Sequence, residues 1–371
     1  MSILKPPPKI RSGLRPLSWI YGLGVGFRNA LFDNGILKQK EYPVPIICVG
    51  NLTVGGTGKT PHIEYIIRLL SDKYKVAVVS RGYKRKSSSL QVVETISDVN
   101  RVGDEPKQMK LKYPDTTIIV DKDRRNAIEY LLKQPKDKQP DVILLDDGYQ
   151  HRYVKPSLSI LLMDSNRPIY EDALLPAGSL REPLRRKDRA SMVIVTKCGS
   201  HVLPIHFRIF ANGLDLFPFQ SLYFTDFVYH RLQPVFPKMN EETFSLNDIR
   251  KKQVLLVAGI ASTKSLEEKL SKKTNNLHTL FFPDHHFYDK RDIKAIEKQF
   301  EGLPENKIVI TTEKDSVRLQ SLSYISDELK KNLFFLPIKV SFLEDTETES
   351  FNKKIINHVR DYQKNSRLPK E

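Results

Sequence analysis

One stretch of the chain decides the fold: Pro45-Ile-Ile-Cys-Val-Gly-Asn-Leu-Thr-Val-Gly-Gly-Thr-Gly-Lys-Thr60. An apolar, β-branched run leads into a glycine-rich turn, and a helical pattern follows over residues 61–70. Strand, glycine-rich loop and helix in this order are typical of a phosphate-binding loop, where successive backbone N–H groups and the helix N-terminus face phosphate oxygens. The stretch therefore predicts a nucleotide-binding α/β domain.

The same motif assigns roles within residues 53–60. Lys59 is predicted to reach the β- and γ-phosphates of a nucleotide, and Thr60 to hold Mg²⁺. The consensus G-x-x-x-x-G-K-[ST] is broken at its first position, where Thr53 replaces glycine. The predicted nucleotide-binding residues are Thr53, Val54, Gly55, Gly56, Thr57, Gly58, Lys59 and Thr60.

An acidic pair follows another apolar run, Asp141-Val-Ile-Leu-Leu-Asp-Asp147. A phosphate-binding loop needs an acidic residue at the end of a neighbouring strand to organise Mg²⁺ or water, so we predict a metal site at Asp146 and Asp147. Adenine is favoured over guanine, because Thr196-Lys-Cys-Gly199 lacks the acidic residue of the guanine-specific N/T-K-x-D element. ATP and Mg²⁺ are therefore the expected cofactors.

Short β-branched runs alternate with helix-like spans, which predicts βαβ units and a doubly wound, mostly parallel sheet like that of P-loop NTPases. These runs lie at residues 44–49, 76–80, 117–120, 142–145, 159–163 and 192–196. A second α/β pattern starts at residue 254, and 371 residues are too many for one core, since cores stop growing at about 250–300 residues. We therefore expect a second, smaller α/β domain.

We divide the chain into four parts on this basis. Residues 1–40 form an N-terminal amphipathic segment, residues 41–210 the nucleotide-binding domain, residues 211–235 a linker and residues 236–371 the C-terminal α/β domain.

The N-terminal segment contains apolar and aromatic residues at helical spacing over residues 17–32. Cationic residues come before this pattern, namely Lys5, Lys9, Arg11 and Arg15. Aromatic side chains behind a cationic flank suit a helix lying in a membrane interface, although the same stripe could pack on the protein's own core. It is too short to cross a bilayer, which takes about 20 apolar residues.

The charge and the cysteines limit the class of partner and the compartment. Lys and Arg total 60 against 44 Asp and Glu, a net charge of +16. This excess favours nucleic acid, an anionic membrane or a phosphorylated substrate, or serves solubility alone. Cys48 and Cys198 lie in apolar runs without metal-ligand spacing, which fits a reducing compartment and gives no disulfide framework.

Seven strings along the chain carry a more specific signal. In order, they are Gly50-Asn-Leu-Thr-Val-Gly-Gly-Thr-Gly-Lys-Thr-Pro61, Ser80-Arg-Gly-Tyr83, Val102-Gly-Asp-Glu-Pro106, Asp146-Asp-Gly-Tyr-Gln-His-Arg152, Leu174-Leu-Pro-Ala-Gly-Ser-Leu-Arg-Glu-Pro-Leu184, Pro283-Asp-His-His286 and Thr311-Thr-Glu-Lys-Asp315. Together they resemble the tetraacyldisaccharide 4'-kinase family, the lipid A 4'-kinases of Gram-negative bacteria. The resemblance implies transfer of the γ-phosphate of ATP to the 4'-hydroxyl of tetraacyldisaccharide 1-phosphate, which gives lipid IV A.

The resemblance also implies site residues. Asp104 matches the family's general base and His285 the partner of that base, while Lys59 and Arg181 match residues that act on the phosphates. Read alone, Asp104 could be a helix N-cap, His285 an ordinary histidine, and Arg181 with Glu182 a surface ion pair. The expected metal residues are Thr60, Asp146, Asp147 and Glu182.

Further residues are assigned more loosely. Arg81, Tyr83 and Arg124 are candidates for contact with the sugar or phosphate of the lipid, and Gln150 for positioning a group near the acidic pair. A four-chain lipid does not leave the bilayer easily, because each buried CH₂ contributes about 0.8 kcal/mol. We therefore expect a monotopic protein on the cytoplasmic face of the bacterial inner membrane, with no nucleic acid and no obligate protein partner.

Three other functions fit part of the pattern. A P-loop kinase for another lipid or sugar would keep Lys59 and Asp146 but would make the Pro283-Asp-His-His286 string incidental. A nucleic-acid-dependent ATPase would need basic grooves with interleaved aromatic residues, which the spread of Lys and Arg does not suggest. A switch ATPase of the chromosome-partitioning type would carry a second lysine where this chain has Val54.

Overall fold

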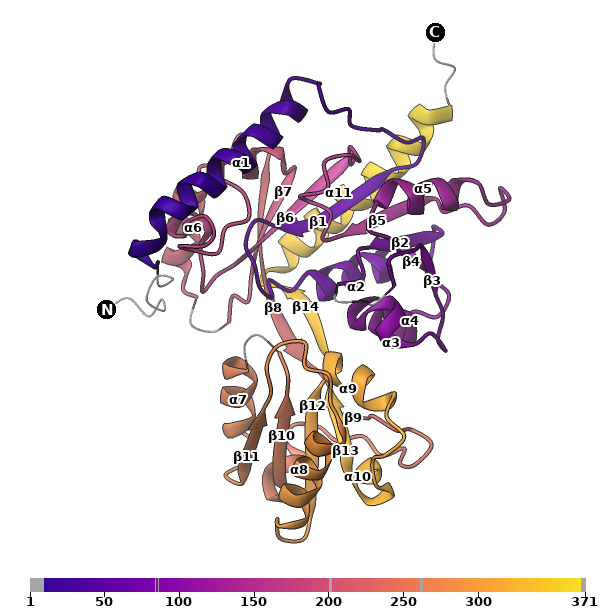
Figure 1. Cartoon of the computed structure of the whole chain (residues 1–371), viewed down its shortest axis with the longest axis vertical. Coiled ribbons are helices and arrows are strands. Elements are labelled where there is room, and N and C mark those ends of the chain that lie inside the picture. Colours follow the sequence, from indigo (N-terminus) through magenta and orange to yellow (C-terminus); the bar gives the residue numbers. More distant parts are fainter. Residues whose placement is uncertain (1–9, 84, 86, 200–201, 261–262, 368–371) are drawn as a thin grey trace.

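The computed structural model describes residues 10–83, 85, 87–199, 202–260 and 263–367 (Figure 1). Within these ranges the strands form a nine-stranded sheet and a five-stranded sheet, each covered by helices. Lys5 and Lys9, which were part of the predicted cationic flank, lie outside the described residues.

The larger sheet has the order β14-β8-β7-β6-β1-β5-β2-β4-β3. Neighbouring strands from β8 to β4 pair in parallel, while the edge strands β3 and β14 are antiparallel. The strands are β1 (Ile46–Asn51), β2 (Val76–Ser80), β3 (Gln91–Val93), β4 (Thr117–Val120), β5 (Val142–Asp146), β6 (Leu158–Asp164), β7 (Met192–Thr196), β8 (Ser221–Tyr229) and β14 (Ile338–Phe342). The predicted mostly parallel sheet is confirmed, and its central strands are buried on both faces, which explains their continuous apolar sequence.

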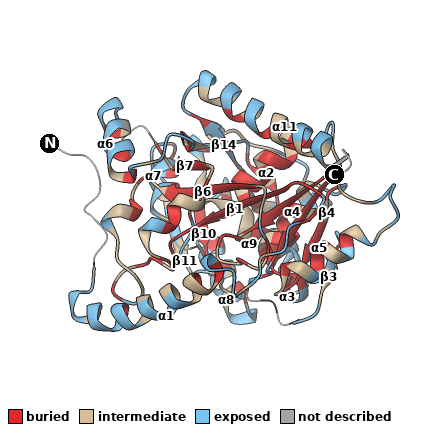
Figure 2. Ribbon diagram, turned by 90° about the horizontal axis from the view of Figure 1, so that it is seen from above, coloured by how far each residue is buried: buried red, intermediate tan, exposed pale blue. Residues whose placement is uncertain are grey.

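Helices cover both faces of this sheet and bury two apolar clusters against it. One face carries α2 (Lys59–Leu70), α4 (Asp104–Lys112) and α11 (Asp345–Arg367). The other face carries α5 (Arg124–Leu132) and α6 (Pro204–Leu214). Figure 2 shows the buried strands between these helices. The chain also forms the short helix α3 (Val99–Val102) and the 3-10 turns Ser12–Leu14, Ile169–Glu171, Leu184–Arg189 and Asp248–Lys251.

The smaller sheet has the order β11-β10-β12-β13-β9, and only β9 runs antiparallel to its neighbour. Its strands are β9 (Gln233–Pro234), β10 (Gln253–Ala258), β11 (Leu277–Phe281), β12 (Lys307–Thr312) and β13 (Leu333–Leu336). Its helices are α7 (Lys264–Ser271), α8 (Lys290–Glu301), α9 (Glu313–Gln320) and α10 (Asp327–Asn332). Two apolar clusters separate these helices from the sheet, so the second α/β unit has a core of its own.

The predicted boundaries differ from the structure at the junction of the two sheets. The middle of the expected linker, residues 211–235, is strand β8 of the larger sheet. The expected C-terminal part, residues 236–371, does not stay with the smaller sheet, because β14 pairs with β8 and α11 packs on the larger sheet. The smaller sheet is thus inserted between two paired strands (Figure 1). Pairing over such a separation leaves no local sequence pattern.

The N-terminal helix, α1 (Arg15–Asp33), has two different faces. Asn29 and Phe32 are buried against the protein. Trp19, Leu23 and Phe27 point outward and are 72%, 75% and 68% exposed, and Figure 2 shows the helix along one edge of the molecule. Among the described residues, no helix is long and apolar enough to cross a membrane.

Candidate active site

The glycine-rich loop, residues 53–58, connects β1 to α2 as predicted. Gly55 and Gly58 have φ angles of +107° and +88°, a region that favours glycine. Thr53 forms a β-bridge with Leu180, and this extended conformation suits threonine, which explains why glycine is not needed at the first position of the motif. The loop therefore keeps glycine where the backbone turns.

Lys59 begins α2 and points toward Asp147. Its Nζ lies 3.6 Å from Oδ1 of Asp147 and 3.4 Å from Oδ1 of Asn51. Arg181 approaches the same carboxylate, with Nη2 2.9 Å from Oδ1, and also hydrogen-bonds Asn51. Burial would raise the pKa of Asp147, but the charges of Lys59 and Arg181 outweigh it and hold the pKa well below its usual range. Two predicted cationic residues and one predicted acidic residue thus meet beside the loop.

Asp146 ends β5 and is 1% exposed. Its Oδ2 accepts a hydrogen bond from Ser80 at 3.0 Å, whereas its Oδ1 has no partner among the described residues. Burial, then the charges of Glu105 and Asp147, raise the pKa of Asp146 to about 7. A buried carboxylate oxygen without a partner is costly unless a cation or a proton occupies it, so Asp146 fits a metal ligand.

Glu182 differs from Asp146, because both of its oxygens have partners. Oε1 accepts from Asn29 of α1 at 3.1 Å, and Oε2 from Arg189 at 2.5 Å. The surface ion pair with Arg181 that the sequence left open is not formed, since Arg181 pairs with Asp147. Among the described residues, no three His, Cys, Asp or Glu side chains gather in a group that could hold a metal ion.

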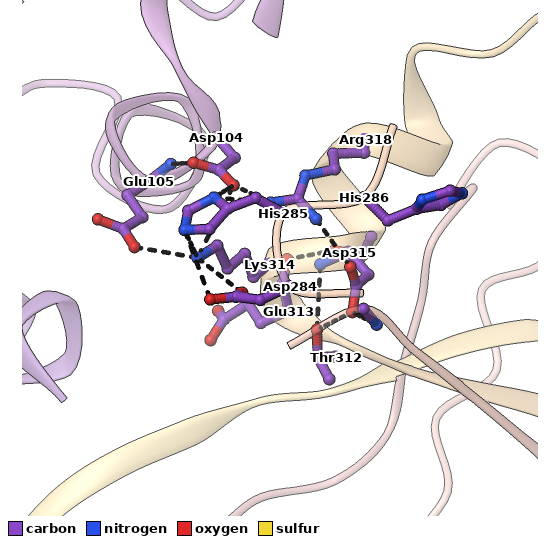
Figure 3. A network of polar contacts seen from close by, with 12 residues as sticks. Asp104, Glu105, Asp284, His285, His286, Thr312, Glu313, Lys314, Asp315 and Arg318 are labelled. Carbon is purple, nitrogen blue, oxygen red and sulfur yellow. Dashed lines mark hydrogen bonds and ion pairs between the residues drawn. The ribbon is translucent and has the colours of Figure 1, made fainter. Parts of the chain in front are cut away.

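Asp104 and His285 meet across the junction of the two sheets (Figure 3). Asp104 is the first residue of α4, His285 follows β11, and His285 Nδ1 lies 3.1 Å from Oδ2 of Asp104. The neighbouring His286 pairs instead with Asp292 at 2.8 Å. The structure therefore brings together the two residues that the strings matched, although 181 positions separate them.

Two cationic residues of α9 complete this cluster, and the sequence reasoning gave them no role. Lys314 Nζ lies 3.0 Å from Nε2 of His285 and 3.2 Å from Glu105. Because an ammonium only donates hydrogen bonds, Nε2 accepts and Nδ1 of His285 carries the proton toward Asp104. Arg318 hydrogen-bonds the Asp104 carboxylate and lies 3.0 Å from Asp315.

The charges around Asp104 decide its ionisation. Burial would raise the pKa of Asp104, but the hydrogen bond from His285 and the charges of Lys314 and Arg318 hold it well below its usual range. Lys314 belongs to the quoted string Thr311-Thr-Glu-Lys-Asp315 and could have been inferred from it. Arg318 lies one turn further along the same helix face, a spacing that is visible in the sequence once the helix is assigned.

Comparisons with known proteins agree with this arrangement. A sequence profile of the family described as Tetraacyldisaccharide-1-P 4'-kinase matches residues 10–360. The chain belongs to this family. It is similar to the tetraacyldisaccharide 4'-kinases of Phocaeicola vulgatus, with 49% identity over 96% of this chain and 98% of that protein, and of Bacteroides thetaiotaomicron, with 48% identity over 96% of each. A crystal structure of LpxK from Aquifex aeolicus in complex with ATP has 31% identity and a TM-score of 0.72, covering 94% of this chain and 99% of that one.

The remaining residues that the 4'-kinase resemblance singled out lie around the same site. Tyr83 is exposed, and its ring centroid is 5.0 Å from that of His285. Arg124 is buried and donates to the Asp147 carbonyl at 3.1 Å, and burial lowers the pKa of its guanidinium. Gln150 donates to the Asn51 carbonyl at 2.8 Å, whereas Arg81 is exposed.

Proposed function

We propose that this chain transfers the γ-phosphate of ATP to the 4'-hydroxyl of tetraacyldisaccharide 1-phosphate, the step of lipid A biosynthesis that yields the 1,4'-bisphosphate. The observation that carries the proposal is the pairing of Asp104 with His285, in a chain that also has a glycine-rich loop between β1 and α2. Family membership supplies the substrate, and the pairing supplies a base for a hydroxyl acceptor.

Asp104 acts as the general base. Its carboxylate accepts the proton of the 4'-hydroxyl as the oxygen bonds to phosphorus. A carboxylate with a low pKa is a weak base, but phosphoryl transfer passes through a loose transition state in which positioning matters more than basicity. His285 donates to Oδ2 and so orients the carboxylate.

Lys59 and Arg181 act on the phosphates, together with the backbone N–H groups of residues 53–60, which form the P-loop. Lys59 reaches the β- and γ-phosphates in this proposal, and Arg181 stabilises charge that spreads over the transferred group. Asp147 pairs with both cations and so holds them on one side of the site. The cations are thereby oriented before ATP binds.

Mg²⁺ fits the residues at the end of β5. The open Oδ1 of Asp146 would hold the ion, together with Thr60 and Asp147, two other predicted ligands. When bound, Mg²⁺ neutralises the charge of the triphosphate and orients it. Glu182 does not contact the ion in this proposal, because its two oxygens accept hydrogen bonds from Asn29 of α1 and from Arg189.

The acceptor lipid reaches the site from a membrane surface. An open groove of about 630 Å³ runs along the outer face of α1. Its lining includes Trp19, Leu23 and Phe27 of the helix, and Leu174 and Arg185. Exposed aromatic side chains on such a helix suit the interfacial region of a bilayer, and arginine suits its anionic head groups. We place α1 on the cytoplasmic face of the inner membrane, as a monotopic anchor.

The two sheets correspond to two domains in this proposal. The larger one binds ATP and carries Asp104, while the smaller one contributes His285, Lys314 and Arg318. The base is therefore complete only when the domains are apposed.

The reaction is tested by incubating the enzyme with γ-labelled ATP and tetraacyldisaccharide 1-phosphate in detergent micelles. The wild type should give a labelled bis-phosphorylated lipid, and Lys59→Ala should reduce its formation at least about a hundredfold, as loss of a charge-stabilising group does. Hydrolysis of ATP without a labelled lipid would contradict the proposed lipid acceptor but would still be consistent with the proposed nucleotide site.

A further inference from the structure

The carbonyl oxygens of the glycine-rich loop meet side chains from the ends of β6 and β7. Thr196, the last residue of β7, donates from Oγ1 to the Thr57 carbonyl at 3.0 Å. Lys197, the next residue, places Nζ 2.6 Å from the Gly56 carbonyl oxygen. These residues belong to the string Thr196-Lys-Cys-Gly199, which resembles the guanine-specificity element but lacks its acidic residue.

Lys197 is itself held in place. Its Nζ lies 2.6 Å from Oδ2 of Asp164, the last residue of β6, and Asp164 pairs with Thr196 in the sheet register. Its backbone has a φ of +60°, which is uncommon for a residue other than glycine, and its carbonyl accepts from Ser165 at 2.8 Å. The Lys197 ammonium is thus fixed between a carboxylate and a loop carbonyl.

These contacts fix the direction of the peptide N–H groups in the loop. In a trans peptide the C=O of one residue and the N–H of the next point in opposite directions. With the carbonyls of Gly56 and Thr57 directed at Lys197 and Thr196, the N–H groups of Thr57 and Gly58 point to the other side. Among the described residues, no hydrogen bond is donated by a backbone N–H of residues 55–58, so these groups are free for phosphate oxygens.

We propose that Lys197 is a positioning residue for ATP, which acts with Thr196 by fixing the peptide groups of Gly56 and Thr57 in the orientation that binds the triphosphate. Glycine-rich loops lose much conformational entropy when they become ordered. Contacts that fix the loop beforehand remove part of this cost from nucleotide binding. The effect concerns the phosphates of ATP and not its adenine. It does not depend on which hydroxyl accepts the phosphate.

The test is a binding titration of Lys197→Met in the presence of Mg²⁺ and the absence of lipid. The probes are a non-hydrolysable ATP analogue and inorganic tripolyphosphate, which has no adenine. Both dissociation constants should rise about tenfold to a hundredfold, as expected for loss of a charged hydrogen bond. In a separate transfer assay with the acceptor lipid present, KM for ATP should rise by the same factor, whereas kcat should stay within about threefold.

Two further variants make the test specific. Lys197→Arg retains a cationic donor and should recover most of the affinity, and Thr196→Val should raise both constants several-fold. Lys155→Met is the matched control, because it removes an exposed lysine whose Nζ also lies 2.6 Å from a carboxylate, that of Glu41. Unchanged binding in Lys197→Met and Thr196→Val, or weakened binding of the nucleotide but not of tripolyphosphate, would overturn the proposal. Because no acceptor is present in the binding titrations, their results do not bear on the lipid assignment.

Discussion

Asp104 shows how one carboxylate is kept ionised by its surroundings. Its contacts with His285, Lys314 and Arg318 all favour the charged form. The folded-state pKa lies below the unfolded value, so these contacts add stability above the unfolded pKa, and this stability is lost as the pH falls through the folded pKa. The Asp104 carboxyl, the proposed base, is therefore deprotonated over the whole neutral range.

Replacing Arg318 with methionine should raise the pKa of Asp104. With one cation fewer the pKa of Asp104 rises toward its ordinary value, and the acid limb of the kcat/KM profile shifts to higher pH. At neutral pH we expect kcat/KM to fall about tenfold to a hundredfold, because a buried charged hydrogen bond is lost.

The rate profile of Arg318→Met from pH 3 to 8 tests this expectation, because a carboxyl whose pKa is near its ordinary value titrates below about pH 5. Arg360→Met is the control, since Arg360 forms an exposed pair with Asp361 at 2.9 Å. A variant that loses activity by the same factor at every pH would show that Arg318 supports the fold rather than the ionisation of Asp104.

Individual site residues could be predicted where a motif has a local form. Lys59 and Asp146 follow from a strand, a loop and a helix in a fixed order, and the structure places them at the same edge of the sheet. Asp104 and His285 needed the family strings, because nothing local shows that they meet. The occupied oxygens of Glu182 could not be foreseen, since they depend on Asn29 and Arg189 arriving from other elements.

The glycine-rich loop packs against β8, the strand that leads to the smaller sheet. A Cβ on Gly58 would lie 2.4 Å from Cζ of Phe227 in β8, and the φ of Gly58 is +88°. Gly56 differs, because its Cβ would meet no atom of the described residues within 4 Å. Gly56 can therefore serve as the control position for a substitution of Gly58 in the same loop.

Gly58→Ala should destabilise the ligand-free protein by at least about 1–2 kcal/mol, the cost of a left-handed backbone for a residue with a Cβ, and more from the contact with Phe227. Gly56→Ala should leave the thermal unfolding midpoint nearly unchanged. Equal midpoints for the two variants in ligand-free scans would contradict this description of the loop.

Helix α1 offers a test of membrane contact that does not disturb the fold. Leu23 is largely exposed, so Leu23→Asp should not affect stability, but it should lower co-sedimentation with anionic vesicles several-fold, because a charge then enters the interface. Ile96→Asp, at an exposed apolar residue remote in sequence from α1, is the control. Vesicle binding that is equal in both variants would argue against α1 as the anchor.

The whole molecule depends on contacts between the two sheets. Lys112 of α4 lies 2.6 Å from Glu64 of α2 and 2.8 Å from Glu313 of α9. One ammonium therefore links α2, the helix after the glycine-rich loop, to a helix of the smaller sheet. Burial, then the charge of Glu313, raise the pKa of Glu64 to about 7. The sequence could not predict this link, because the insertion between β8 and β14 brings these helices together.

Glu64→Gln should change the dependence of stability on pH. Glu64 has a folded-state pKa above its unfolded value, so the folded protein binds the extra proton, and the contribution of Glu64 to wild-type stability falls as the pH rises from about 4.5 to about 7. Glutamine does not titrate, and the free energy of unfolding of the variant relative to the wild type should increase by about 1–3 kcal/mol over this window.

Denaturant unfolding at pH 4.5 and pH 7.5 measures the change. The hydrogen bond from Gln108, at 3.1 Å, can be kept by the amide. A difference between variant and wild type that stays constant with pH would mean that Glu64 remains charged in the folded protein.

The most direct test of the account is single-turnover transfer of label from γ-labelled ATP to tetraacyldisaccharide 1-phosphate by the wild type and Asp104→Asn. The variant keeps the shape of the side chain and removes the base. We predict that the transfer rate falls about 10²- to 10⁴-fold, the range for loss of general base catalysis, while the dissociation constant of a non-hydrolysable ATP analogue changes less than about twofold. A variant that transfers label at close to the wild-type rate would contradict the assignment of Asp104 and His285 as the reacting pair.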